Sequence, residues 1–376
     1  MVEKKLESRI KGIDISVSDK NIIVKSSVPL NILSSAVLNG GITKSKYIIN
    51  HYVPKDYDHQ MPEELLLQTA KKFGLDESCV GLMTAVKMEN VIVENFESGE
   101  FKLTVIVTGG TTNSIQVGQQ IEDEMKKNGT INIILITNAN LNLSAMVTTS
   151  QVITEAKTMA LLNLDIRSQY GGYATGTTTD SIIIACQEEG PKIKYAGTAT
   201  MIGSKIGNLI KIAVKKAIIK RENKNSDRDI IIRLEERGIK ITDLIETAME
   251  LYIPHPGIET KEKARISLEK NLNKFLKDPN VAILLMSAFR IQEDGEQGLI
   301  PMISKENFVK DPVYIVADEI LGMAISNYIA GTRGIFEFYR FDSKKPGIIK
   351  KMGVFIDDII GGLLAGVSSL IYSEGD

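Results

Sequence analysis

A decapeptide without a single apolar residue, KRENKNSDRD at positions 220–229, divides the chain of 376 residues into two stretches of different character. Before it stand β-branched runs that end in clusters of Gly, Thr and Asn, at residues 101–108, 130–137 and 180–186. This pattern is typical of strands that lead into loops. After it, apolar residues recur with the 3.6-residue period of helices, and no comparable strand run follows. We therefore predict two domains, at residues 1–219 and 230–376, as the chain length also suggests.

Helices are predicted between the strands of the first stretch. Residues 62–73 begin with Pro62 and are followed by Gly74, in keeping with the preferences of helix ends. Residues 204–220 carry apolar side chains at i, i+3 and i+4 spacing, as expected of a surface helix packed on a sheet. The fold class is therefore a two-domain one, an N-terminal α/β or α+β domain with a multi-strand sheet and a C-terminal all-α domain of six or seven helices.

The charge balance excludes two classes of partner. With 45 basic and 47 acidic residues, the net charge of −2 gives no attraction toward nucleic acid or an anionic membrane.

Cys79 and Cys186 lack the spacing of a thiolate metal site or of a disulfide framework. A charged N-terminus without an apolar core argues against export, so we expect a cytoplasmic protein that acts on small molecules. The number of subunits is left open, and a homo-oligomer is allowed.

One segment has the length of a membrane span. Residues 352–372 are 21 mostly apolar residues, but they contain the pair Asp357 and Asp358. A charge at the centre of a bilayer costs about 2.5 kcal/mol or more, whereas a core helix can turn such carboxylates toward a site. We predict a buried helix and no integral membrane span.

Five carboxylates occur in otherwise apolar surroundings near the C-terminus: Asp318, Glu319, Asp342, Asp357 and Asp358. Carboxylates are rarely buried unless something neutralises them, and hard divalent cations do so through oxygen ligands. Because neighbours on a helix are about 100° apart, we expect one member of each adjacent pair to be a metal ligand. The other member would orient Lys345 or a ligand water. Small residues around Gly362 and Gly366 would let another helix come close and bring these acids together.

A second set of charges lies in the N-terminal stretch. In the predicted helix at residues 151–164, Glu155 and Lys157 each share a face with apolar residues. Buried charges need partners, so these two would either hold a substrate group or pair with a residue such as Asp180 or Arg167. Loops rich in Gly, Thr and Asn surround this helix in sequence, and they offer neutral donors and acceptors for a large ligand with many amide groups.

These residues carry a resemblance. The motifs GTINIILITNANL, TEAKTMALLNLDIRS, GYATGTTTDSIIIA and YAGTATMIGSKIG, with LSSAVLNGG at residues 33–41, resemble the adenosylcobinamide amidohydrolase family over most of residues 30–215. The resemblance implies cleavage of the amide that joins the aminopropanol arm to the corrin ring, with the corrinoid as substrate and not as cofactor. A departure from the family pattern is TTNS at residues 111–114, where a form closer to LSNA is expected.

The resemblance brings forward several site residues. For catalysis they are Glu155, Lys157, Thr177 and Asp180. For substrate binding they are Gly40, Gly41, Asn113, Asn138, Thr175 and Gly176. Amide hydrolysis needs a base and a group that stabilises the oxyanion. Glu155 or Asp180 would be the base, Thr177 a nucleophile or donor, and Lys157 or loop amides the oxyanion partners.

The C-terminal motifs carry another resemblance. DEILGM, EFYRFDSKKP and MGVFIDDIIGGLLAG are similar in order and spacing to the phosphatidylglycerophosphatase A family. The chain lacks the Gly-Pro-rich element and the additional apolar spans of the membrane-bound members, so it resembles their soluble relatives, which include an α-ribazole 5′-phosphate phosphatase. The whole chain resembles fusions of such a phosphatase with the amidohydrolase. This resemblance implies a bifunctional enzyme of cobamide salvage and assembly.

For the phosphatase the resemblance implies six catalytic residues: Asp318, Glu319, Asp342, Lys345, Asp357 and Asp358. The five acids among them would bind Mg²⁺. Two alternatives stay open at this point. The C-terminal part could act on a lipid, phosphatidylglycerophosphate, or the N-terminal part could bind a corrinoid without hydrolysing it.

Overall fold

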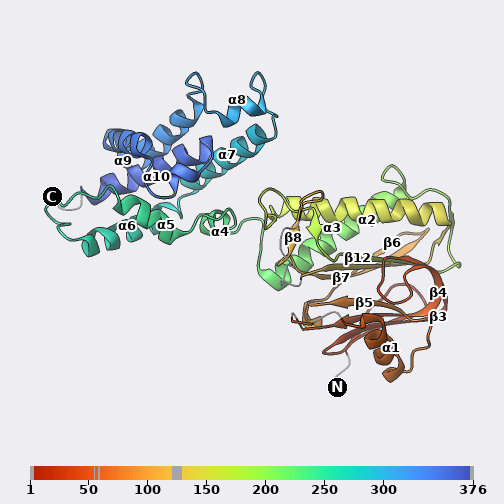
Figure 1. The fold of residues 1–376 in the computed structure, drawn as a ribbon. Coiled ribbons are helices and arrows are strands. Elements are labelled where there is room, and N and C mark those ends of the chain that lie inside the picture. Colours follow the sequence, from red (N-terminus) through yellow and green to blue (C-terminus); the bar gives the residue numbers. More distant parts are fainter. Residues whose placement is uncertain (1–3, 55, 58–59, 121–128, 373–376) are drawn as a thin grey trace. The chain divides into compact units, whose positions relative to one another are not determined.

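The computed structural model describes residues 4–54, 56–57, 60–120 and 129–372. Two compact units make up the chain, Met1–Ser226 and Asp227–Asp376. The first is a mixed β-sheet with helices and the second is helical, so the predicted fold class is confirmed (Figure 1).

Unit 1 is built on a sheet of nine strands. Along the sheet the order is β1, β2, β3, β12, β9, β7 and β6, and β4 pairs with both β3 and β5. The strands are β1 (Lys4–Leu6), β2 (Ile13–Val17), β3 (Asn21–Ser34), β4 (Gly41–Tyr52), β5 (Val80–Thr84), β6 (Ile92–Glu97), β7 (Lys102–Gly109), β9 (Ile131–Thr137) and β12 (Ser181–Cys186). Most neighbours are antiparallel, but β12 runs parallel to β9 and β5 parallel to β4.

The central strand β9 is buried along its whole length because both faces of the sheet are covered. Its side chains alternate, so that Ile133 and Leu135 enter one core while Ile134 and Ile136 enter another. The first core lies under two long helices, α2 (Leu143–Asn163) and α3 (Met201–Glu222), which pack on this face of the sheet (Figure 1). A strand buried on both faces has a continuous apolar sequence, as residues 130–137 do.

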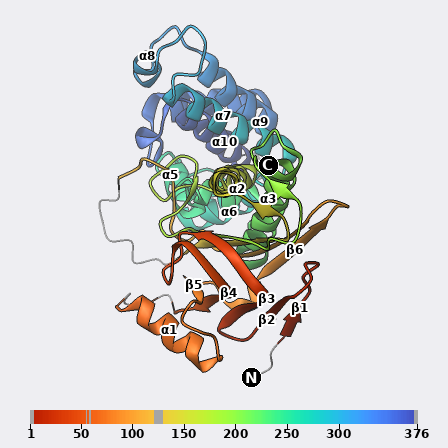
Figure 2. The same ribbon diagram turned by 90° about the vertical axis from the view of Figure 1, so that its right-hand side faces the viewer.

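The opposite face of β9 and β12 is covered by other strands of the same sheet. The long strand β3 has an irregularity between Lys25 and Leu30, and it pairs with β2, β4 and β12 along its length. Strands β4 and β5 thereby contribute to the second core opposite β9 and β12. Helix α1 (Pro62–Lys72) packs on the outer side of these strands, as Figure 2 shows, and the short helix η1 (Met88–Asn90) precedes β6.

Two small strand pairs complete unit 1. Strand β8 (Ser114–Ile115) pairs antiparallel with β11 (Gly176–Thr177), and β10 (Asn140–Leu141) pairs parallel with β13 (Lys192–Ile193). The first pair lies close to the start of β9, because Asp180, just after β11, accepts a hydrogen bond from the backbone N–H of Ile131 (3.0 Å). The second pair lies beyond the other end of β9. The two pairs therefore lie near opposite ends of the central strand β9.

Unit 2 packs its helices around one apolar core. The helices are α4 (Ile230–Glu235), α5 (Ile241–Met249), α6 (Lys261–Phe275), α7 (Pro279–Glu296), α8 (Lys305–Val309), α9 (Ala317–Lys344), η2 (Ile349–Lys351) and α10 (Val354–Ile371). Of the helices in the described part of the chain, α10 alone is long and apolar enough to cross a membrane, and 89% of it is buried inside the protein. The helix predicted at residues 352–372 is therefore buried, as expected.

Helix α9 is not straight. Gly331 has non-helical angles (φ 62°, ψ −150°), a conformation that glycine adopts without steric cost. The chain folds back at this point, since Gly334 lies against the carbonyl oxygen of Ser326 and the ring of Phe338 lies against Gly322. In a straight helix Gly322 and Phe338 would be about 24 Å apart. The two halves of α9 therefore lie side by side, and both ends of the helix come to the same region.

Glycines bring α9 and α10 into close contact. A Cβ atom built on Gly362 would lie 2.2 Å from the carbonyl oxygen of Gly322, and one on Gly366 would lie 2.7 Å from Cβ of Ile329. The predicted role of small residues in this helix is thus confirmed. Because Asp358 precedes Gly362 by one turn, this contact also places Asp358 beside the first turn of α9.

The helix contact can be tested by adding one methyl group. Gly362→Ala forces α10 away from α9, so we expect a loss of about 1–3 kcal/mol in the free energy of unfolding, measured by urea denaturation. Gly361→Ala is the matched control, because its Cβ would meet only ordinary contacts at 3.6 Å and beyond. Since alanine favours the helix by up to about 1 kcal/mol, this control should be neutral or stabilising. Equal losses in both variants would contradict the close contact.

Candidate active sites

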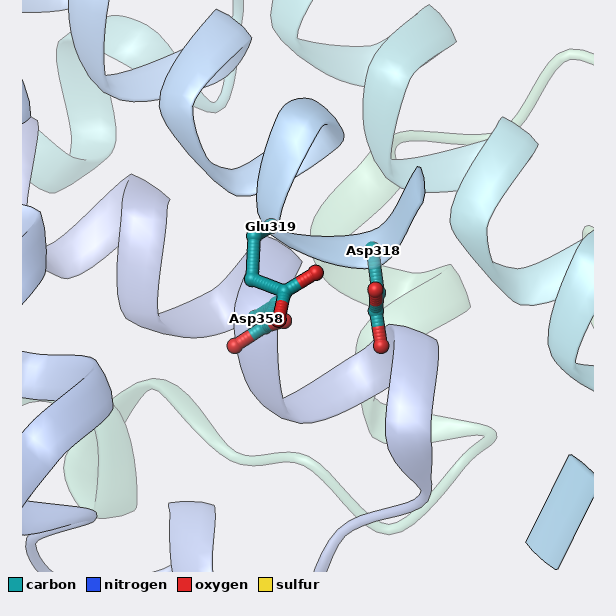
Figure 3. A group of neighbouring side chains, drawn as sticks. All are labelled: Asp318, Glu319 and Asp358. Atoms are coloured by element: carbon teal, nitrogen blue, oxygen red, sulfur yellow. The ribbon is translucent and has the colours of Figure 1, made fainter. Parts of the chain in front are cut away.

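Three carboxylates meet where α9 begins and α10 passes it. Asp318 and Glu319 occupy the first turn of α9, and Asp358 projects from α10 (Figure 3). Each offers an oxygen atom, and these three oxygens lie within 4.8 Å of one another. We call Asp318, Glu319 and Asp358 the acidic triad. The prediction that distant carboxylates converge is met for these three residues.

Both members of the first pair belong to the triad, which differs from the expectation of one ligand from each pair. The longer side chain of Glu319 reaches the same point as that of Asp318, although their positions on the helix are about 100° apart (Figure 3). The second pair follows the expectation. Asp358 is a member of the triad, whereas the side chain of Asp357 contacts Lys345.

Lys345 holds the remaining two acids. Its Nζ donates to Oδ2 of Asp357 at 2.5 Å and lies 4.0 Å from Oδ1 of Asp342. Lys345 ends α9 in the left-handed conformation (φ 40°), directly before Pro346, and its side chain lies beside the start of α10. Partial burial disfavours its charge, but the hydrogen bond to Asp357 and the negative charges of Asp357, Asp358 and Asp342 together outweigh the burial and raise the pKa of Lys345. Asp342 and Asp357, predicted as metal ligands, thus contact Lys345 and lie outside the triad.

The triad is electrostatically crowded. Burial, together with Glu319, raises the pKa of Asp318 to about 8. Burial and the neighbouring Asp357, Asp342 and Asp318 raise the pKa of Asp358 to about 8. In addition, Oδ1 of Asp318 and Oε2 of Glu319 are buried without a hydrogen-bond partner in the described part of the chain. Such orphaned oxygens are costly, and a hard divalent cation would satisfy them. The residues therefore fit a Mg²⁺ ion.

The crowding predicts how metal binding depends on pH. Carboxyl groups whose pKa is raised to about 8 retain protons in the folded protein, so its stability falls as pH rises from about 4 to 8. A cation must displace these protons, so its affinity should rise about tenfold per pH unit for each proton displaced, levelling off above pH 8. We expect Mg²⁺ to raise the melting temperature more at pH 8 than at pH 6. Asp358→Asn should remove most of this gain, and an equal gain at both pH values would contradict the triad as the site.

A different arrangement lies at the edge of the sheet in unit 1. Nζ of Lys157 on α2 donates to Oδ2 of Asp180 at 2.5 Å, and both side chains are nearly buried. Asp180 also accepts from the backbone N–H groups of Thr177 and Ile131, each at 3.0 Å, and from the hydroxyl of Thr177. Asp180 thus receives four hydrogen bonds. Of the pairings considered from the sequence, Lys157 with Asp180 is the one formed.

Three of the predicted binding residues surround this pair. A Cβ atom on Gly176 would lie 2.6 Å from Oδ2 of Asp180 and 2.9 Å from Nζ of Lys157, so only glycine leaves room for the ion pair. The side-chain amide of Asn113 donates to the hydroxyl of Thr178 at 2.6 Å, and its oxygen is buried without a partner in the described part of the chain. Thr175 accepts from the hydroxyl of Thr158 through its carbonyl oxygen. These contacts bring the 113–114 and 175–180 segments together around Asp180.

Other predicted residues lie elsewhere. Glu155 was expected among apolar neighbours but is exposed, because it lies two residues from Lys157 and so on the opposite side of α2. There it lines a groove of about 470 Å³ between α2 and α3, with Lys205 and Lys211. Asn138 follows the far end of β9, about 20 Å from its start at about 3.3 Å per residue. Its side-chain oxygen accepts from the backbone of Lys102 (2.7 Å).

Gly40 is the last residue of the connection between β3 and β4, and Gly41 is the first residue of β4. Gly40 lies against the carbonyl oxygen of Ala36, and Gly41 has φ 87°, so both have a local conformational role. This connection begins at Ser35, whose hydroxyl lies 2.9 Å from that of Ser181 at the start of β12. The two glycines therefore lie near the connection that approaches the start of β12, where Asp180 is found.

The sequence did not point to Glu222. Its carboxylate accepts from the backbone N–H of Thr111 (2.7 Å) and from the hydroxyl of the same residue, and Lys224 lies 3.1 Å away. Arg221 packs its guanidinium against Gly110. The polar segment 220–229 was interpreted as a boundary, yet its first residues end α3 and anchor the loop after β7. The absence of apolar residues gave no signal for this role.

Comparisons with known proteins find a family match for each part. Residues 5–226 match the adenosylcobinamide amidohydrolase family, and residues 238–373 match the phosphatidylglycerophosphatase A family. The first match spans more than half of the chain and covers the Lys157–Asp180 pair. The second covers the acidic triad and Lys345.

Individual proteins are similar to parts of this chain. The adenosylcobinamide amidohydrolase of Methanosarcina mazei is 33% identical over 213 residues, which are 54% of this chain and 96% of that protein. An uncharacterized protein of Methanocaldococcus jannaschii is 39% identical over 132 residues, which are 34% of this chain and 99% of that protein. Among solved structures, the low temperature requirement C protein from Listeria monocytogenes covers 39% of this chain and 94% of its own, with 27% identity and a TM-score of 0.34.

Proposed function

Because the chain belongs to the adenosylcobinamide amidohydrolase family, we propose that unit 1 hydrolyses the aminopropanol amide of adenosylcobinamide and releases adenosylcobyric acid. The observation that carries the catalytic assignment is the hydrogen-bonded chain of Thr177, Asp180 and Lys157. A hydroxyl that donates to a carboxylate, beside a buried ammonium group, supplies a nucleophile, a proton acceptor and a positive charge within one site.

The proposed reaction uses these groups in order. The Thr177 oxygen attacks the amide carbon while its proton passes to Asp180, and the carbonyl π electrons move onto the oxygen. Lys157 stabilises the resulting oxyanion. The amide C–N bond then breaks, and the proton held by Asp180 passes to the leaving amine. Water hydrolyses the Thr177 ester by the same route, which releases the acid and restores the hydroxyl. The hydrogen bonds from Lys157 and from the backbone N–H groups of Thr177 and Ile131 hold Asp180 in place while the Thr177 proton is transferred.

The role of the Thr177 hydroxyl can be separated from its shape. Thr177→Val keeps the branched side chain but removes the hydroxyl, and we expect at least about a hundredfold loss of aminopropanol release from adenosylcobinamide. Thr177→Ser keeps the hydroxyl and should retain most of the activity. Glu155→Gln should also stay active, because Glu155 lies on the other side of α2. Loss of activity in Glu155→Gln with full activity in Thr177→Val would overturn the assignment. If the wild-type protein bound adenosylcobinamide tightly but did not hydrolyse it, unit 1 would instead be a corrinoid-binding module.

For unit 2 we propose the dephosphorylation of α-ribazole 5′-phosphate to α-ribazole. The match to a phosphatase family and the buried acidic triad with its orphaned oxygens support it. Asp318, Glu319 and Asp358 would hold Mg²⁺, which neutralises a phosphate and helps to ionise water. Lys345 would donate a hydrogen bond to a phosphate oxygen, and its contacts with Asp357 and Asp342 would hold its ammonium group in position.

The two activities should respond differently to loss of the triad. In the whole chain we expect Asp358→Asn, or a chelator, to abolish phosphate release from α-ribazole 5′-phosphate, with a loss of at least about a thousandfold. Aminopropanol release should be unchanged, because the Lys157–Asp180 site holds no comparable group of orphaned carboxylates among the described residues. Phosphate release that persists in the chelated Asp358→Asn variant would contradict the proposal.

A second candidate substrate is phosphatidylglycerophosphate, which the name of the matched family favours. A parallel assay with a short-chain form of this lipid distinguishes the two. Hydrolysis of the lipid without hydrolysis of the riboside phosphate would replace the first proposal with the second.

A further inference from the structure

An apolar pocket is lined in part by α9 and α10, the two helices that carry the acidic triad. Its volume is about 570 Å³, and twelve residues from α7 to α10 line it. Among their side chains, Tyr314 has the only polar group. A pocket of this size falls within the range of about 300–1,000 Å³ that small-molecule sites occupy. We refer to it as the apolar pocket.

The pocket and the triad share the same elements. Ala317 and Ile320, which line the pocket, flank Asp318 and Glu319 in the sequence of α9. Phe355 also lines it, and one turn further along α10 stands Asp358. A molecule whose phosphate reaches the triad therefore has its remaining part close to an apolar cavity.

The walls of the pocket suit a flat group. Phe355 is buried and stacks on Phe308, with ring centroids 5.8 Å apart and planes 5° from parallel. At the rim, Met302 and Tyr314 are exposed and provide adaptable apolar and aromatic surface. Aromatic rings recognise other rings through such offset or edge contacts. Charged or strongly polar groups would lose their hydration there without gaining partners.

We infer that the apolar pocket binds the aromatic base of a nucleoside 5′-phosphate whose phosphate lies at the triad, and that it selects bases with an apolar edge. This inference rests on the proposed phosphatase function and names the part of the substrate that gives specificity. The base contributes binding energy through burial of its rings, while the phosphate and the triad carry the chemistry.

Binding without phosphate tests the pocket separately from catalysis. The probe is α-ribazole, which carries the base and ribose but no phosphate, titrated by calorimetry into the whole chain treated with chelator. We expect saturable binding, and about tenfold weaker binding for the riboside of unsubstituted benzimidazole, because two buried methyl groups are lost. Ile300→Asn places a polar group in the pocket and Met302→Asp places one at its rim. Each variant should weaken the binding of α-ribazole at least tenfold. Ile266→Asn, an exposed isoleucine of α6 outside the pocket, is the matched control and should bind as the wild type does.

The outcomes separate the pocket from the proposed activity. Met302 is fully exposed, so its variant should fold even if Ile300→Asn does not. Phosphate release from α-ribazole 5′-phosphate without measurable binding of α-ribazole, or equal binding by wild type and Met302→Asp, would overturn the pocket while leaving the phosphatase in place. Binding of α-ribazole without phosphate release would support the pocket and contradict the proposed reaction. Equal hydrolysis of ribose 5-phosphate and α-ribazole 5′-phosphate would also overturn selection by the base.

Discussion

The contact between Gly322 and Gly362 is the constraint on which unit 2 depends. Two helices approach so closely here that a single Cβ atom would meet a carbonyl oxygen. The same contact fixes the distance between Asp358 and the first turn of α9, so the spacing of the acidic triad follows from packing by backbone and small residues. A third glycine, Gly331, folds α9 back and returns Asp342 and Lys345 to the region of the triad. The acidic centre is therefore a consequence of how the helices pack.

The two sites bury charge in opposite ways. In unit 1, Asp180 has four hydrogen-bond donors, and its ion pair with Lys157 is completed within the fold. Such a site is rigid before any ligand arrives, which suits the positioning of one hydroxyl. In unit 2, Asp318 and Glu319 retain buried oxygens for which the described residues offer no donor, and the pKa values of Asp318 and Asp358 are raised to about 8. That site is incomplete by itself, which suits a centre that acts with a bound cation.

The sequence predicted those features that depend on local pattern. The two fold classes, the long helices and the buried strand at residues 130–137 follow from periodicity and turn residues. The site was predicted in part. That Lys157 would need a partner followed from its helix face, whereas the exposure of Glu155 did not, because apolar neighbours in a helix sequence do not show which side another helix covers. The common orientation of Asp318 and Glu319 depends on side-chain rotation, and the anchoring of Glu222 on Thr111 joins residues 111 positions apart. Neither leaves a periodic signal.

The charge balance around Lys345 also limits what the acidic centre can admit. Around it stand five carboxylates against a single ammonium group, and if all were ionised four negative charges would remain uncompensated. A phosphate monoester, itself a dianion at neutral pH, would be repelled at short range by this group of carboxylates. A divalent cation bound to Asp318, Glu319 and Asp358 would remove half of this excess, even after it has displaced the protons. The order of events then follows from Coulomb's law, since compensation of the acids has to precede the arrival of the phosphate.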